Sequence, residues 1–207
     1  MLAYKFLDAE GRAPFTGTAW IPGVWVEAGD ASPCRRGVHA CRAGDLSHWL
    51  SAALWEVELD GAVVDGRHKV AAGRGRLVRR IDAYDTKARE LAAVGAWRSR
   101  DRAVHALRVA RCDDLATRLA GISDLEELAA SGGEADESTF AGAAAALATD
   151  AAYFALHGNP SQSPFVAACS AGHVAAGPDG DQAAYDRGYA AERAFQSDWL
   201  ARELGLT

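Results

Sequence analysis

The chain has 207 residues, of which 49% are hydrophobic and 24% are charged, and its formal net charge is −6 at pH 7. This composition supplies enough apolar residues to bury a core, so it excludes a disordered chain, a collagen and a small disulfide-rich scaffold. The negative charge argues against a protein that binds nucleic acid through bulk positive charge. With 46 Ala but only 3 Lys, the composition is typical of a high-GC bacterial genome, such as that of an actinobacterium.

The first 82 residues predict five to seven short strands separated by turns. Residues 2–7 suit a first strand, and residues 54–60 give the clearest pattern, because apolar and acidic side chains alternate as in a half-buried antiparallel strand. We expect Gly61 to turn the chain and Asp65-Gly66 to form a hairpin turn before a last strand over residues 74–81.

A helix is expected between these strands, with Asp45 as its N-cap, and it runs through Trp49 and Leu50. From Asp85 onward the apolar spacing changes from alternation to the helical period. Ser123-Asp124-Leu125-Glu126 matches a capping box, in which the Ser123 side chain accepts a backbone hydrogen bond.

Further helices are expected over residues 140–156, 165–174 and 181–204. The predicted fold class is therefore α+β: an antiparallel β-rich N-terminal part followed by an Ala-rich bundle of four or five helices. We expect residues 1–84 to form the β-rich part and residues 85–207 the helical part, with the helices packed on the sheet as one compact unit.

The N-terminal residues lack the charged and apolar regions of a secretory signal, and the most apolar stretch, residues 141–156, is shorter than a membrane span. We therefore expect a cytoplasmic protein that does not enter a membrane and keeps its four cysteines reduced. The expected partners are a small molecule or a protein, and nucleic acid is not expected.

The segment from Cys34 to Cys41 brings two thiols and His39 close together in the sequence. Zinc takes such ligands, and His48 or Cys112 would complete a set of four. Alternatively Cys41 is a nucleophile whose pKa His39 lowers, or the two cysteines are small core residues. We name His39 and Cys41 as candidate catalytic residues and assign no metal ligand.

Glu56 and Glu58 share one face of their strand, so they are candidates for paired acid–base carboxylates. The alternative is that both lie on the solvent face of an amphipathic strand. Arg76 belongs to a basic stretch over residues 67–80 that suits a phosphate or a carboxylate. Acidic residues on neighbouring strands would equally neutralise this stretch.

Aromatic residues are concentrated early in the chain, where Trp20, Trp25 and Trp49 accompany His39. Aromatic walls with few polar groups are typical of ligand pockets. These four residues, together with Arg76, are therefore our candidates for ligand binding, and no cofactor is named.

Five segments resemble a bacterial and phage domain of unknown activity over about residues 3–82: Tyr4-Lys5-Phe6, Cys34 with Gly37-Val38-His39-Ala40-Cys41, Trp55-Glu56-Val57-Glu58 with Gly61, Lys69-Val70-Ala71 and Arg76-Leu77-Val78-Arg79. The pattern of that domain is a Gly-[Phe/Val]-His-Ala-Cys segment, a Trp/Tyr-x-Val-Glu strand and a closing Arg-rich strand. More remotely, the first part is similar to the start of the ADP-ribosyltransferase fold. That resemblance implies that His39 and Trp49 line a nicotinamide pocket.

Three functions stay open from the sequence. The first is binding of a small ligand or partner through an aromatic pocket in the β-rich part. The second is an ADP-ribosyltransferase-like or thiol-dependent enzyme. The third is an immunity or regulatory interaction protein that uses the helical half, because residues 86–207 hold the whole net charge of −6 and would steer a basic partner.

Overall fold

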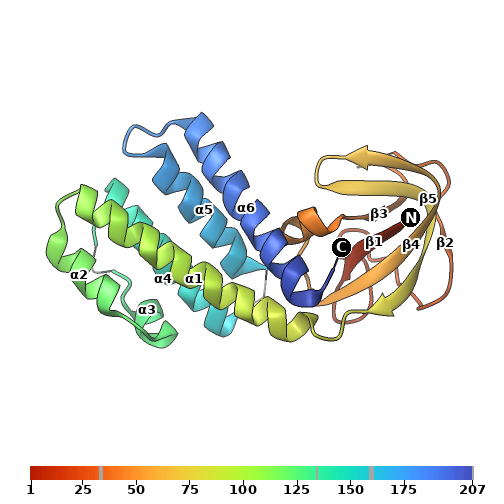
Figure 1. The fold of residues 1–207 in the computed structure, drawn as a ribbon, viewed down its shortest axis with the longest axis horizontal. Helices are drawn as coiled ribbons and strands as arrows, with labels where there is room; N and C mark the ends of the chain where they lie inside the picture. Colours follow the sequence, from red (N-terminus) through yellow and green to blue (C-terminus); the bar gives the residue numbers. More distant parts are fainter. Residues whose placement is uncertain (33–34, 134, 159–160, 207) are drawn as a thin grey trace. The chain divides into compact units, whose positions relative to one another are not determined.

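The fold is that of a computed structural model, which describes residues 1–32, 35–133, 135–158 and 161–206. The chain divides into two compact units, Met1–Lys87 with Ser197–Thr207 and Ala88–Gln196. The first unit holds an antiparallel sheet and the second is helical, so the predicted α+β fold class is confirmed (Figure 1). The expected packing of the helices on the sheet as one unit stays a prediction.

One five-stranded sheet organises the first unit. Its elements in chain order are β1 (Leu2–Leu7), β2 (Val26–Glu27), β3 (Val38–Ala40), the 3-10 helix η1 (Ala43–His48), β4 (Ala53–Gly66) and β5 (Lys69–Arg80). β5 pairs antiparallel with β4, β3 and β2, and β4 also pairs with β1. Backbone hydrogen bonds in both directions join Tyr4 to Cys41, directly after β3, so the order β1-β4-β5-β3 closes on itself.

β4 and β5 form a long hairpin that differs from the prediction in two places. β4 continues through Gly61, where a turn is predicted, because a register shift over residues 60–63 absorbs the irregularity. Gly61 has a φ of 84°, which glycine adopts without strain. The turn falls at Arg67 and His68 rather than at residues 65–66, since pairing persists until Gly66 meets Lys69.

The core of the first unit confirms the alternation predicted for residues 54–60. Val57 and Leu59 are fully buried, whereas the alternating residues Glu56 and Glu58 keep contact with solvent. The cluster around them consists of apolar side chains from β1, β3, β4 and β5, including Ala3, Leu7, Val38, Val70 and Leu77. The apolar face of the sheet is therefore the one that the sequence pattern indicates.

The described residues contain six α-helices. They are α1 (Tyr84–Val109), α2 (Asp113–Gly121), α3 (Leu125–Ala130), α4 (Phe140–His157), α5 (Gln162–Ala176) and α6 (Gln182–Leu204). The sequence predicts a bundle of four or five helices, and α2 is the helix that this prediction misses. The N-cap of α3 is Asp124, whose side chain accepts from Glu127 N at 3.0 Å, so the assignment of Ser123 to this role is wrong.

Small side chains let the helices of the second unit pack closely. α4 packs against α3 and α5, and its buried face is almost entirely alanine and glycine. The buried carboxylate of Glu192 accepts hydrogen bonds from Arg98 and Arg102. Within the described ranges, no helix combines the length and apolar character needed to cross a membrane.

Candidate metal centre

Three metal-ligating side chains converge at the tip of the β4–β5 hairpin. Asp45 and His48 come from η1 and His68 from the hairpin turn, and their ligand atoms all lie within 4.8 Å of one another. Oδ1 of Asp45 is 3.0 Å from Nδ1 of His68. The His48 and His68 rings stack with centroids 3.8 Å apart. All three residues are partly buried, which partly shields the group from water.

The 3-10 geometry of η1 explains why two of the three side chains point the same way. Residues three apart are eclipsed in a 3-10 helix, so Asp45 and His48 project from one side. The expected role of Asp45 as an N-cap is wrong, because η1 begins after Arg42 and has no side-chain cap. The Asp45 carboxylate is directed at His68 instead.

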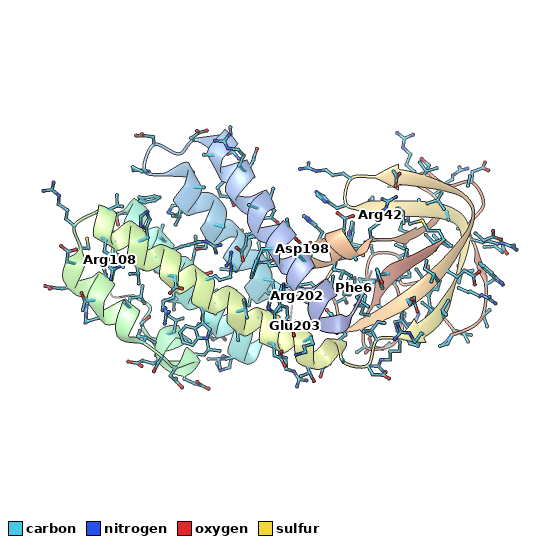
Figure 2. All side chains as sticks on the ribbon, viewed as in Figure 1. Phe6, Arg42, Arg108, Asp198, Arg202 and Glu203 are labelled. Carbon is cyan, nitrogen blue, oxygen red and sulfur yellow. The ribbon has the colours of Figure 1, made fainter. Side chains whose placement is uncertain are left out.

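η1 is fixed at both ends within the first unit. Arg42, directly before it, forms an ion pair with Asp65 near the hairpin tip, and Figure 2 shows Arg42 beside the hairpin. The buried backbone N–H of Ser47 donates to Ser197 Oγ at 3.0 Å. Asp45 and His48 are therefore carried by a short element with attachments on either side.

His68 has an unusual backbone. Its φ of 57° lies in the left-handed region, which is uncommon outside glycine and costs about 1 kcal/mol or more. The indole N–H of Trp49 donates to the His68 carbonyl, and Asp45 holds its ring. These two contacts, one on the backbone and one on the side chain, keep the imidazole beside η1 despite the strain.

Two imidazoles and one carboxylate suit a divalent first-row transition metal such as zinc or iron(II). Asp45 and His68 share a hydrogen bond in the structure, and a bound cation would replace the shared proton. A tetrahedral ion with bonds of 2.0–2.1 Å needs ligand atoms about 3.3 Å apart, so the group has to contract slightly by side-chain rotation. Three protein ligands leave at least one coordination position for another molecule.

His39, predicted as a catalytic and ligand-binding residue, is half-buried on β3. Burial and the positive charges of Lys69 and Lys5 lower its pKa, against backbone hydrogen bonds that raise it. Its imidazole is therefore neutral at pH 7. Its backbone carbonyl accepts a hydrogen bond from Lys5 Nζ at 2.8 Å.

Cys41 is almost completely buried. Burial raises its pKa, and the Asp45 carboxylate raises it further, so the thiol stays protonated at neutral pH. This environment disfavours the predicted nucleophile and favours the alternative of a small core residue. Cys34 lies outside the described residues, and its predicted pairing with Cys41 and His39 stays a prediction.

Trp20 is buried, and the Lys5 ammonium lies 4.7 Å from the centroid of its ring. Burial lowers the pKa of Lys5 to about 8, and interaction with Cys41 only partly opposes this. Trp20 therefore covers a buried cation in the core rather than presenting a face to a ligand.

Trp25 and Trp49 lie at different ends of β5. Trp25 contacts the guanidinium groups of Arg74 and Arg76, at 4.7 and 4.9 Å from its ring centroid, whereas Trp49 contacts Lys69 at the other end. Five to seven residues of strand separate these places by roughly 20 Å. The structure thus does not bring the two rings to one pocket. Two cavities of about 380 Å³ each lie in the second unit, lined by none of these residues.

Three acidic residues of β4 neutralise three arginines of β5, as one of the two alternatives predicts. Arg76 pairs with Glu58 at 2.7 Å and Arg79 pairs with Glu56 at 3.2 Å, while Arg74 pairs with Asp60. Glu56, Glu58 and Arg76 are therefore already engaged with opposite charges on the sheet surface.

Sequence reasoning does not identify Asp45 and His68 as ligands, and it considers His48 only as a partner of the Cys34–Cys41 segment. The usable signal is an Asp-x-x-His spacing in a short helical turn together with a histidine in a hairpin turn. Nothing in the sequence relates these two features, because they are separated by the whole of β4.

No family model, curated protein or solved structure matches this chain. The resemblances to a bacterial and phage domain and to ADP-ribosyltransferases therefore stay predictions. Function has to be inferred from the residues of the chain itself.

Proposed function

We propose that the first unit binds one divalent first-row transition-metal ion through Asp45, His48 and His68. The observation that carries this proposal is the convergence of one carboxylate oxygen and two imidazole nitrogens within 4.8 Å, from two separate elements. The left-handed backbone of His68 supports it, since strained residues are concentrated at functional sites.

Stacking of the two imidazoles also favours metal binding over a purely structural role. The two rings stack with centroids 3.8 Å apart, so one ion can contact a nitrogen of each. Asp45 supplies the negative charge that a cation needs. A divalent ion held by these three residues keeps a net positive charge, which favours an anion in the open position.

Zinc titration by calorimetry tests the proposal with two matched variants. His68→Asn removes the ligand while keeping a residue type that tolerates a φ of 57°. His157→Asn changes an exposed histidine near the end of α4 and serves as the control. We expect one zinc equivalent in the wild type and in His157→Asn.

In His68→Asn the affinity is expected to fall at least about 100-fold, because loss of even an outer-shell partner costs 10–100-fold. Circular dichroism verifies that the variant is folded. Absence of zinc binding to the wild type, or equal binding by a folded His68→Asn, would refute the function.

Binding of a small ligand is the first function expected from the sequence, and this proposal assigns it to a specific place in the first unit. The ligand site is the hairpin tip around Trp49 rather than a pocket shared by three tryptophans. The enzyme and the interaction protein stay alternative predictions, each with its own test: NAD turnover for the former and a pull-down with the helical half for the latter.

A further inference from the structure

Trp49 connects the metal ligands to a cation and to a second aromatic ring. It follows His48 directly in the chain, and its indole N–H donates to the carbonyl of His68. The Lys69 ammonium lies 5.3 Å from its ring centroid. Phe15 meets the same ring edge to face, with centroids 6.1 Å apart. These five residues form one connected group.

The Lys69 ammonium is available to pair with the anionic group of a ligand. Among the described residues, no carboxylate lies within ion-pair distance of it. Three arginines of the same strand differ from it, since Arg74, Arg76 and Arg79 each have an acidic partner. A cation that is only partly buried, next to a metal ligand and without a carboxylate, favours binding of an anion.

Phe15 supplies apolar surface at the same place. It is 84% exposed, the largest exposed fraction among the large apolar side chains of the described residues. Folding removes little of the apolar surface of this ring from water. Contact with the apolar part of a bound molecule would therefore bury additional apolar surface and favour binding. The edge-to-face contact holds it against Trp49.

We propose that the metal ion and Lys69 together bind the carboxylate of a small organic acid, whose apolar or aromatic body lies against Trp49 and Phe15. This inference rests on the proposed metal binding. The ion takes one carboxylate oxygen in its open position, and the ammonium of Lys69 donates to the other. The two aromatic rings select acids with an apolar body over acetate.

Cobalt-loaded protein tests the inference, because the visible absorption of Co²⁺ changes when its ligands change. The loaded wild type is titrated with sodium benzoate and, separately, with sodium acetate, at constant ionic strength. Lys69→Met keeps the aliphatic stem on Trp49 and removes the ammonium. Lys87→Met is the control, since it removes a different lysine of the same unit.

We expect a saturable spectral change with benzoate, tighter binding of benzoate than of acetate, and no effect of Lys87→Met. Lys69→Met is expected to weaken benzoate about 10-fold or more, as for loss of a charge-assisted hydrogen bond. Bound Co²⁺ with no response to benzoate, or equal benzoate affinity in Lys69→Met, would overturn the inference alone. Failure of Co²⁺ itself to bind would overturn the metal function, and this inference with it.

Discussion

Replacing Lys5 by Met removes a buried charge, and the structure gives the size and the pH range of the effect. Burial lowers the pKa of Lys5 from 10.5 to about 8. That difference corresponds to about 3 kcal/mol of stability, since each pKa unit is worth 1.36 kcal/mol. Below pH 8 the amine is charged in both the folded and the unfolded chain, so the folded state carries the whole penalty.

Between pH 8 and 10.5 the unfolded chain still holds this proton while the folded chain has released it, so the Lys5 contribution rises with pH. The Lys5→Met variant has no amine at this position and therefore lacks this pH-dependent contribution to stability. The free energy of unfolding of the wild type minus that of Lys5→Met should therefore rise by about 3 kcal/mol across this range. Taking the difference removes the opposing effects of Cys41 and Tyr84, whose pKa values burial raises.

Urea unfolding followed by tryptophan fluorescence, at several values between pH 7.5 and 10.5, measures both proteins. At pH 7.5 the variant should be the more stable of the two, although it loses the hydrogen bond to His39 O and the contact with Trp20. Parallel pH profiles would refute the reasoning, because they would mean that the Lys5 amine is not desolvated.

Three further substitutions test the packing and the charges. Gly75→Ala should destabilise the chain by about 1–3 kcal/mol in thermal unfolding, since its Cβ would lie 2.9 Å from Val38 Cγ1; no loss of stability would contradict the strand packing. Glu192→Gln should lower the free energy of unfolding by about 2 kcal/mol. This is less than the roughly 3–5 kcal/mol lost when a fully buried ion pair is broken, because Arg98 is partly exposed. No loss of stability would mean that water already solvates the pair. Glu58→Gln, in an exposed pair, should cost less than about 1 kcal/mol and leave zinc affinity unchanged; lost zinc binding would relocate the site.

Local patterns predict much of this fold because they act over a few residues. The alternation over residues 54–60 and the change of period at Asp85 correspond to β4 and α1. The errors lie where a choice depends on distant partners. Gly61 is a turn signal by itself, but pairing of β4 with β5 turns it into a bulge. Asp124 rather than Ser123 caps α3, because its side chain accepts from Glu127 N and its own backbone is extended.

The candidate site is less predictable than the fold because its parts meet only through tertiary structure. Cys41 is conspicuous in the sequence, yet its burial raises its pKa and disfavours the thiolate. Asp45 and His68 are inconspicuous, and they become neighbours only because η1 lies against the hairpin turn. A one-dimensional pattern contains no signal for that contact.

X-ray absorption at the zinc edge of the zinc-loaded protein tests the central claim most directly, because it reports the ligand atoms themselves. We expect nitrogen and oxygen neighbours at about 2.0–2.1 Å with the outer-shell pattern of two imidazoles, and no sulfur at about 2.3 Å. A zinc–sulfur distance would contradict this expectation and would place the ion on a cysteine, such as one of the Cys34–Cys41 segment, instead of on Asp45, His48 and His68.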